Sequence, residues 1–293
     1  MAQLLDGKAT AKQVRRRIKE EIDGLCGSAS RRPHAVFIQV GSLPASTTYV
    51  NLKHKAAQEA GMVSTIERLP AGCGQQELLE LLHKCNTDRN VHAILVQLPL
   101  PGHIDEMTVA QAIAPAKDLD CFHPENVGRM ALGLPGPKPA TPQGVLLLLD
   151  AYGLDPYGMN ATVVGRSNLV GKPLGLLLLA RHATVTYCHT RTRDLTAACR
   201  GADLLVAAGG RPALIRGGMV KPGAIVVDVG TNYVAQSTPD GGTQMKLTGD
   251  VAFDEVEKTA AWISPVPGGV GPMTVASVLS NALTLYKLLE GMA

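Results

Sequence analysis

Residues 161–175 have the sequence ATVVGRSNLVGKPLG, and they carry the strongest fold signal in the chain. The stretch predicts a short buried strand, a glycine-containing turn and a helix that begins near Lys172. This order directs backbone N–H groups and a helix N-terminus toward a phosphate. The glycines Gly165, Gly171 and Gly175 depart from the G-x-G-x-x-G spacing, so the turn alone is equally compatible with a structural role.

The same alternation of apolar runs and helical patterns extends through the whole chain. After the first stretch, residues 183–190, 202–210 and 224–230 predict three further strands with helices between them. Before it, HAVFIQVG (34–41) and VHAILVQLPLP (91–101) predict strands in the first half. This order indicates an α/β fold with parallel strands, and the second half resembles a Rossmann-like sheet.

A proline- and glycine-rich segment, LGLPGPKPATPQG (132–144), separates the two halves. It predicts a first domain over residues 1–140 and a nucleotide-binding domain over residues 141–272. We expect the last helix, residues 273–293, to pack back on the first domain.

Composition excludes several classes of protein. The 293 residues are 45% hydrophobic and 18% charged with a net charge of +3, which is typical of a globular protein. Aromatic residues make up only 3%, so no nucleic-acid partner is expected, and no apolar run reaches the ~18 residues of a membrane span. The six cysteines are scattered without metal-ligand spacing, which predicts no metal site and reduced thiols in the cytoplasm, with an organelle matrix left open.

The end of the second strand of the nucleotide-binding half favours NADP over NAD. NAD-specific folds usually place an acid there to bind the ribose 2′-hydroxyl. This chain has CHTRTR (188–193) instead, with Thr190, Arg191 and Arg193, and Arg166 follows the first glycine. Such a cluster suits a 2′-phosphate, although a solvated surface cluster remains the alternative.

Catalytic candidates occur in VGSLPASTTYVNLKHKA (40–56). We expect a helix from Tyr49 onward, with Ser46 or Thr47 as its N-cap. Tyr49 and Lys53 then lie four apart on one helical face, and a partly desolvated lysine has a lowered pKa suited to proton transfer. The alternative is an ordinary amphipathic helix with solvated lysines, and spacing alone does not exclude Lys55.

Three later segments add polar or glycine-rich candidates. Gln97 in VQLPLP (96–101) is a polar residue at the end of an apolar strand, serving either a ligand or the fold. KDLDCFHPENVG (117–128) places Asp120 in a loop, as a ligand for an amino-pyrimidine edge or as a cap. PVPGGVGPMT (265–274) has glycines that allow close backbone approach to a ligand.

Taken together, these segments resemble the bifunctional methylenetetrahydrofolate dehydrogenase/cyclohydrolase family over essentially the whole chain. The family's signatures appear in order, as PASTTYVNLKHKA, VQLPLP, KDLDCFHPENVGRM, TPQGV, GRSNLVGKP, DVGTN and PVPGGVGPMT. The resemblance implies two α/β domains around a cleft, usually as a homodimer. It also implies NADP-dependent oxidation of methylenetetrahydrofolate and hydrolysis of the methenyl product.

The resemblance also implies residue roles. Tyr49 would stack on the substrate, Lys53 would be the catalytic amine, Gln97 its partner and Asp120 the pterin anchor. The rest of the folate site would comprise Val96, Leu98, Pro267, Gly268, Gly269, Val270 and Gly271. NADP would contact Gly165, Arg166, Ser167, Thr190, Arg191, Thr231 and Thr274. Two residues depart from the family pattern: Cys121 replaces a usual glycine, and Thr231 a usual isoleucine.

Two other functions remain to be weighed. A Rossmann-type NADP dehydrogenase of a small acid, such as shikimate, would lack the Tyr49–Lys53 platform. A non-enzymatic nucleotide sensor would not require Lys53, Gln97 and Asp120 together. A formyl-folate ligase activity is not expected, because the chain has no GxxxxGK[ST] phosphate loop.

Overall fold

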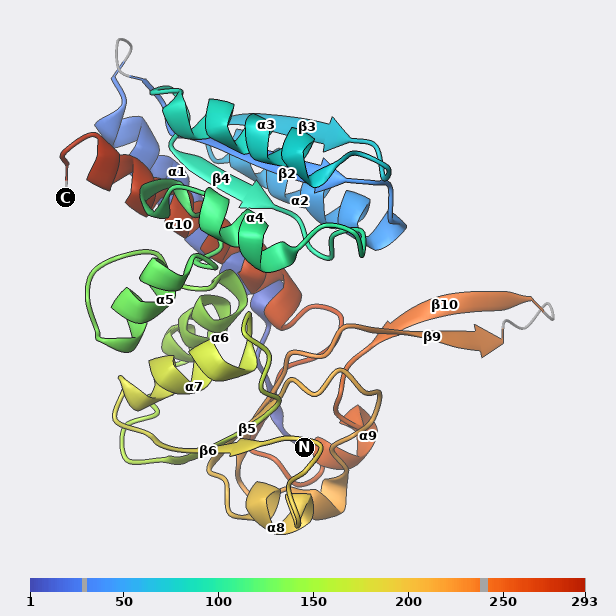
Figure 1. Ribbon diagram of the computed structural model, residues 1–293. Helices are drawn as coiled ribbons and strands as arrows, with labels where there is room; N and C mark the ends of the chain where they lie inside the picture. Colours follow the sequence, from blue (N-terminus) through green and yellow to red (C-terminus); the bar gives the residue numbers. More distant parts are fainter. Residues whose placement is uncertain (28–30, 238–241, 293) are drawn as a thin grey trace. The chain divides into compact units, whose positions relative to one another are not determined.

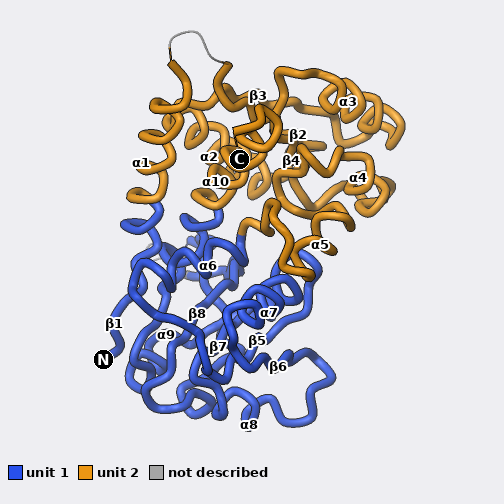
Figure 2. The backbone as a smooth tube through the Cα atoms, turned by 90° about the vertical axis from the view of Figure 1, so that its left-hand side faces the viewer, with its two compact units in different colours: residues 1–11, 141–274 blue, residues 12–140, 275–293 orange. Residues whose placement is uncertain are grey.

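The computed structural model describes residues 1–27, 31–237 and 242–292. The chain divides into two compact units, as Figure 2 shows. Unit 1 consists of Met1–Ala11 and Thr141–Thr274, and unit 2 of Lys12–Ala140 and Val275–Ala293. Each unit contains a parallel sheet covered by helices, so the predicted two-domain α/β fold is confirmed. Within the described parts of the chain, no helix is both long and apolar enough to cross a membrane.

Unit 2 is built on a three-stranded parallel sheet with β2 in its centre (Figure 1). The strands are β2 (His34–Val40), β3 (Val63–Leu69) and β4 (Ala93–Val96). The helices are α2 (Pro44–Glu59), α3 (Gln75–Thr87), α4 (Glu106–Ala112), the short η1 (Pro115–Lys117) and α5 (Pro124–Ala131). Two long helices, α1 (Gly7–Leu25) and α10 (Val270–Leu289), contribute most of their residues to this unit.

Side-chain alternation along β2 creates two apolar cores in unit 2, because successive residues point to opposite faces of a sheet. Phe37 packs with residues of α1, α2 and α10. Its neighbours Val36 and Ile38 pack on the other face with residues of α3 and α4. The central strand β2 is therefore buried on both faces, and Gln97 follows directly after its buried neighbour β4.

Unit 1 contains a six-stranded parallel sheet in the order β1-β11-β8-β7-β5-β6. The strands are β1 (Gln3–Leu4), β5 (Asn160–Val164), β6 (Thr184–Cys188), β7 (Leu204–Ala207), β8 (Ile225–Asp228) and β11 (Trp262–Ile263). A separate hairpin is formed by β9 (Asn232–Ser237) and β10 (Thr243–Thr248). The helices are α6 (Ala140–Ala151), α7 (Gly171–Leu179), α8 (Leu195–Arg200), η2 (Gly217–Met219) and α9 (Phe253–Val256).

The start of α2 differs from the sequence-based expectation. The helix begins at Pro44 and is preceded by Leu43, whose side chain cannot accept a hydrogen bond. The expected N-cap at Ser46 or Thr47 was wrong, because proline fixes a helical φ at the first position and both residues lie inside a helix that starts at Pro44. Tyr49 and Lys53 consequently lie in the body of the helix, with less rotational freedom than at a frayed end.

Candidate active site

Lys53 is the central titratable group of unit 2. It projects from α2 and is only 5% exposed. Its Nζ donates to Oε1 of Gln97 at 3.0 Å. Burial lowers the pKa of Lys53 because the ammonium form loses its hydration, and the Asp120 carboxylate opposes this by raising the pKa. The amine is thus more easily deprotonated than a solvated lysine.

Gln97 follows the carboxyl end of β4, where ligands of parallel sheets usually bind. Its Nε2 donates to the carbonyl of Leu98 at 2.7 Å, so the amide orientation is fixed and Oε1 faces Lys53. The peptide bond between Leu98 and Pro99 is cis. Both polar atoms of this half-buried amide therefore have hydrogen-bond partners, as predicted.

Lys53, Gln97 and Asp120 are thereby brought together, while Lys55 is not. The side chain of Lys55 is 75% exposed and forms an ion pair with Glu59 on the same helix. Tyr49 lies one turn before Lys53 on α2 and is half-buried. Lys55, which helical spacing alone did not exclude as the catalytic lysine, is therefore a surface residue.

Asp118 organises the loop that carries Asp120, a role that the sequence did not reveal. The buried Asp118 carboxylate accepts hydrogen bonds from the backbone N–H groups of Phe122 and His123 at 3.2 and 2.8 Å. It also accepts one from Nδ2 of Asn126 at 2.9 Å. Asp120 lies within this closed loop, and the next residue, Cys121, has a φ of 54°.

Gly165 forms the turn at the carboxyl end of β5 in unit 1. Its φ is 136°, and a Cβ built there would lie 2.1 Å from the carbonyl oxygen of Ala208. A Cβ on Gly171, at the start of α7, would lie 2.3 Å from the carbonyl oxygen of Gly165. Both glycines are therefore required by the close backbone packing between the turn and the start of α7.

Polar and cationic residues follow the carboxyl ends of three strands of the same sheet. Arg166 and Ser167 follow β5, Thr190 and Arg191 follow β6, and Thr231 follows β8. All five are exposed. Ser167 Oγ also accepts from the backbone N–H groups at positions 170 and 171, at 3.2 and 3.3 Å, which fixes the turn. The edge can bind a phosphorylated nucleotide.

Two buried aspartates, Asp228 and Asp250, brace this edge and were missed in the sequence. Asp250 accepts three consecutive backbone N–H groups, from Gly209 to Arg211, at 2.6–3.0 Å and also Nδ2 of Asn232 at 2.8 Å. Burial raises the pKa of Asp228 to about 6, although it accepts three backbone N–H groups of its own. These residues and their partners lie far apart in the sequence, so no local spacing of residues could predict their hydrogen bonds.

The remaining predicted residues of unit 1 lie at the start of α10. The segment Pro267–Gly271 follows a cis peptide bond between Val266 and Pro267, and Gly268 has a φ of 109°. Thr274 Oγ1 lies 3.1 Å from Oγ1 of Thr141 on α6. The backbone of this segment is held by close packing at Gly269, and three of its five residues are glycines without side chains.

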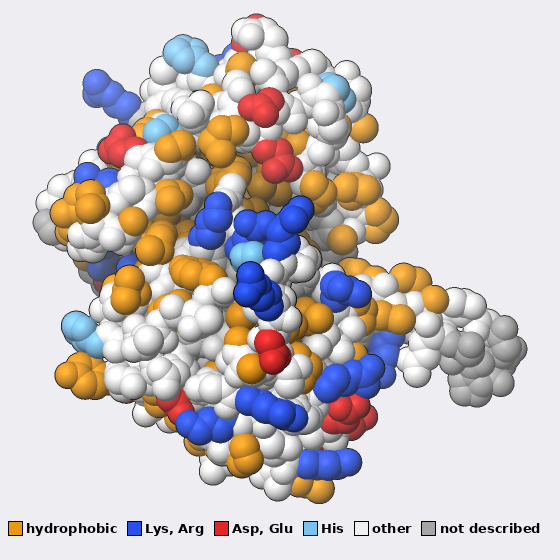
Figure 3. All heavy atoms as spheres, turned by 60° about the horizontal axis from the view of Figure 1, so that its bottom comes forward, with side chains coloured by type: hydrophobic (Ala, Val, Ile, Leu, Met, Phe, Trp, Pro, Cys, Tyr) orange, Lys and Arg blue, Asp and Glu red, His pale blue; other side chains and the backbone are white. Residues whose placement is uncertain are grey.

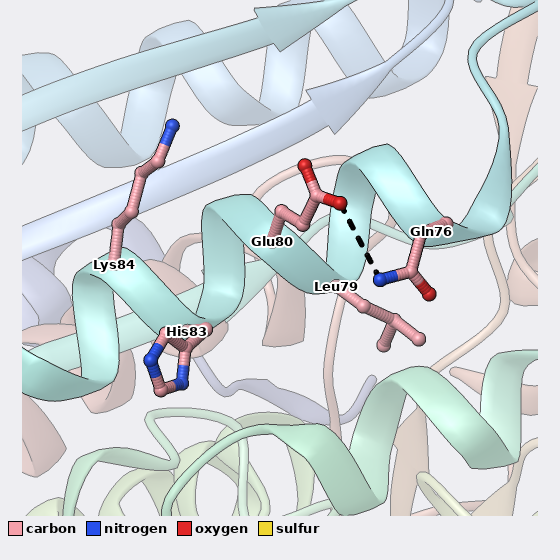
Figure 4. Close-up of a pocket in the computed structure, with 5 residues that line it drawn as sticks. All are labelled: Gln76, Leu79, Glu80, His83 and Lys84. Atoms are coloured by element: carbon pink, nitrogen blue, oxygen red, sulfur yellow. Dashed lines mark hydrogen bonds between the residues drawn. The ribbon is translucent and has the colours of Figure 1, made fainter.

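A shallow depression on α3 lies apart from these groups (Figure 4). It is lined by Gln76, Leu79, Glu80, His83 and Lys84, all from one helix. Figure 4 shows that these side chains leave the helix in different directions, and Gln76 donates to Glu80 at 3.4 Å. The residues do not converge on a common point, so the depression is a helix surface rather than a second site.

Comparison with known families divides the chain in two. Residues 5–120 match the catalytic domain of tetrahydrofolate dehydrogenase/cyclohydrolase. Residues 139–290 match the NAD(P)-binding domain of the same family. The candidate amine and its partners thus fall in the first match, and the glycine turn and cationic edge in the second.

Individual relatives agree with this assignment. The chain is 52% identical to the bifunctional protein FolD of Moorella thermoacetica over 282 residues, covering 96% of this chain and 98% of the relative. It is 41% identical to the Trypanosoma brucei N5,N10-methylenetetrahydrofolate dehydrogenase-cyclohydrolase, solved with NADP and an inhibitor. That structure superposes with a TM-score of 0.92, covering 98% of both chains.

A more distant similarity concerns the shikimate dehydrogenase of Thermus thermophilus. It superposes with a TM-score of 0.55 at 15% identity, covering 88% of this chain and 94% of the other. At that identity the similarity concerns the fold alone. The alternative of a small-acid dehydrogenase therefore has only the shared architecture in its favour.

Proposed function

The chain belongs to the tetrahydrofolate dehydrogenase/cyclohydrolase family, and we propose that it catalyses both reactions of that family. In the first, 5,10-methylenetetrahydrofolate is oxidised to 5,10-methenyltetrahydrofolate with NADP as hydride acceptor. In the second, water hydrolyses the methenyl product to 10-formyltetrahydrofolate. The relatives' names and the two matched domains support both activities.

The observation that carries the proposal is the buried amine of Lys53 held against Gln97. A neutral amine can accept a proton from the water that attacks the methenyl carbon. The resulting ammonium can return a proton to the folate nitrogen as its bond to that carbon breaks. Gln97 accepts a hydrogen bond from Lys53 in both protonation states, and therefore keeps Nζ in place throughout.

The pterin is proposed to be held by the same unit. Asp120 can accept hydrogen bonds from an amino-pyrimidine edge, and the Asp118-braced loop fixes its position. Tyr49, one turn from Lys53, supplies an aromatic face for the substrate ring. Val96 and Leu98 flank Gln97 and complete the folate contacts on this unit.

The edge of the unit 1 sheet fits a dinucleotide. A Cβ would fill the turn at Gly165, and the exposed cations Arg166 and Arg191 follow neighbouring strands. Bound NADP would supply the hydride acceptor for the methylene carbon. Arg166, Ser167, Thr190 and Arg191 would bind its phosphates, and the segment around Thr231 and Thr274 would orient its remainder.

The test is a spectrophotometric assay of purified protein with 5,10-methylenetetrahydrofolate and either NADP or NAD. We expect NADPH to form faster than NADH at equal cofactor concentration, and methenyl-folate added alone to be hydrolysed. Absence of both reactions would refute the proposal. Oxidation without accelerated hydrolysis would remove the role given to Lys53.

We further propose that the protein is a homodimer. The β9–β10 hairpin projects from unit 1, and hydrophobic side chains line part of it (Figures 1 and 3). Tyr233, Val234 and Met245 are 53%, 39% and 56% exposed, and the hairpin forms a two-stranded sheet of its own. A second copy of the chain would bury these side chains and cover an open strand edge.

Sedimentation velocity tests the dimer with Tyr233→Asp combined with Met245→Asp. We expect this double variant to sediment as a monomer at a concentration where the wild type is dimeric. Leu132→Asp is the control, because Leu132 is 77% exposed and belongs to unit 2. A dimeric double variant would exclude the hairpin as the interface.

A reducing compartment such as the cytoplasm is proposed as the location. All six cysteines are free and buried, as expected of a protein that does not rely on disulfides.

A further inference from the structure

The first turn of α1 contacts the segment Pro267–Gly271 through backbone atoms. The backbone N–H of Lys8 donates to the carbonyl of Gly268 at 2.9 Å. Just before it, β1 pairs in parallel with β11, and Leu5 N–H donates to the carbonyl of Ile263 at 2.9 Å. The chain's first residues therefore follow the strand that leads into this glycine-rich segment.

The closest approach between α1 and this segment is at Gly7. A Cβ built on this buried residue would lie 1.8 Å from the carbonyl oxygen of Gly269 and 2.6 Å from its carbonyl carbon. Both atoms belong to the backbone, so no side-chain rotation could relieve the overlap. Any residue larger than glycine at position 7 must displace α1 or the segment by more than about 1 Å, because carbon atoms pack at ~3.5–4 Å.

The segment itself has little space on its other side. A Cβ on Gly269 would lie 2.6 Å from the carbonyl oxygen of Pro265 and 2.9 Å from Cβ of Ser264. The N–H of Gly269 donates to that same Pro265 carbonyl at 2.8 Å. The backbone at Gly269 is thus held between Gly7 and residues 264–265, and its position depends on the absence of a side chain at Gly7.

We propose that Gly7 is a positioning residue for catalysis, which sets the location of Pro267–Gly271 for the folate substrate. The inference rests on the proposed function, because the resemblance to the family implies that this segment lines the folate site. Gly7 touches no reacting atom; it acts only through the backbone of Gly268 and Gly269. A displacement of about 1 Å in a substrate-positioning segment can reduce the rate about 100-fold.

The experiment compares Gly7→Ala with Gly24→Ala, two substitutions in the same helix. Among the described residues outside its own helix, none has an atom within 4 Å of a Cβ on Gly24. We expect Gly7→Ala to lower kcat/KM for methylenetetrahydrofolate about 100-fold at a temperature where the protein is fully folded. We expect its Kd for NADP to change less than about threefold, and Gly24→Ala to match the wild type in both.

A second readout does not depend on activity. Hydrogen exchange of the peptide covering residues 264–272 should accelerate in Gly7→Ala and not in Gly24→Ala. If Gly7→Ala does not fold, Lys8→Pro replaces it, because proline is tolerated in a first helical turn and removes the N–H bonded to Gly268. It should give the same kinetic and exchange pattern.

The outcomes separate the two hypotheses. An inactive wild type would refute the proposed function. An active wild type with unchanged kcat/KM in Gly7→Ala, even at a lowered Tm, would overturn the positioning role and leave Gly7 a residue of stability alone. Unchanged exchange at 264–272 in a less active Gly7→Ala would equally overturn it.

Discussion

Lys53 Nζ and Gln97 Oε1 lie 3.0 Å apart, although the residues come from α2 and the end of β4. The contact joins an amine whose pKa is lowered by burial to an amide fixed by its own bond to Leu98. An isolated buried ammonium would be unfavourable, and the amide oxygen compensates part of that cost. The pair can therefore change protonation without rearranging.

Replacing Lys53 separates the two reactions. Lys53→Met keeps the length and apolar stem of the side chain, so we expect α2 to persist. Because hydrolysis needs a proton acceptor near the water, cyclohydrolase activity should fall about 100- to 10,000-fold. Oxidation depends mainly on substrate placement and should fall less. Methenyl-folate decay and NADPH formation, measured on one preparation, give both values.

Lys55→Met is the matched control, since it removes an exposed lysine two residues away on the same helix. We expect its two activities to remain within about twofold of the wild type, because exposed ion pairs contribute ~0–1 kcal/mol. Loss of hydrolysis in Lys55→Met, with hydrolysis retained in Lys53→Met, would reverse the assignment of the catalytic amine.

Asp120 should set the pH dependence of hydrolysis through Lys53. The negative carboxylate favours the ammonium form and raises the pKa of Lys53, against the lowering caused by burial. Asp120→Asn removes that charge, so the pKa of Lys53 should fall further. If the neutral amine is active, the rising acid limb of the kcat–pH profile should move to lower pH. The profile is measured at saturating folate after subtraction of the uncatalysed rate.

The same variant tests the pterin contact. We expect Asp120→Asn to raise the KM for folate while leaving the Kd for NADP unchanged, because position 120 belongs to unit 2 and the glycine turn at Gly165 to unit 1. A shift of the acid limb to higher pH would contradict the electrostatic argument. An unchanged KM would leave Asp120 with a loop-capping role.

Local patterns in the sequence point to several residues of this candidate site. Tyr49 and Lys53 could be identified because helical spacing places residues four apart on one face. Gln97 stood out as a polar residue at the end of an apolar strand. Gly165 could be identified because a glycine between a strand and a helix is typical of a phosphate-binding turn.

Other parts depend on contacts between distant residues and left no local signal. Strand β1 has only two residues and pairs with Trp262 and Ile263, so it is too short to show a periodic pattern in the sequence. Asp250 stabilises the sheet edge by accepting hydrogen bonds from the backbone N–H groups of Gly209 and Gly210, which lie about forty residues earlier in the chain. Likewise, position 7 must be glycine because it packs against the backbone of Gly269, more than two hundred residues later in the chain.

Cys121 provides a test of backbone strain beside Asp120. Its φ of 54° lies in the left-handed region, which costs a residue with a Cβ ~1–2 kcal/mol. Cys121→Gly relieves this strain but loses a buried thiol, so the free energy of unfolding should change by less than about 1 kcal/mol. Cys121→Val should destabilise the protein by about 2 kcal/mol or more, because β-branched residues are disfavoured there.

Urea unfolding of both variants provides the measurement. Cys199→Val is the control, because Cys199 is also fully buried but lies in α8 with helical backbone geometry. If Cys199→Val and Cys121→Val lose equal stability, the added volume rather than the left-handed backbone would explain the effect.

Cofactor choice should depend on Arg166. This exposed residue follows Gly165 directly, at the edge of the sheet where Thr190 and Arg191 follow β6. A guanidinium bound to the 2′-phosphate would contribute ~1.5–3 kcal/mol, and NAD lacks that phosphate. Arg166→Ala should therefore raise the Kd for NADP about 10- to 150-fold and change the Kd for NAD by less than about threefold.

The control is Arg17→Ala, which removes an exposed arginine of α1 in unit 2 and should change neither Kd. The loss for NADP should also shrink at high ionic strength, because an exposed charge contact is screened by salt. Titration of each variant with both cofactors supplies the four constants, and equal losses for NADP and NAD in Arg166→Ala would place this side chain away from the 2′-phosphate.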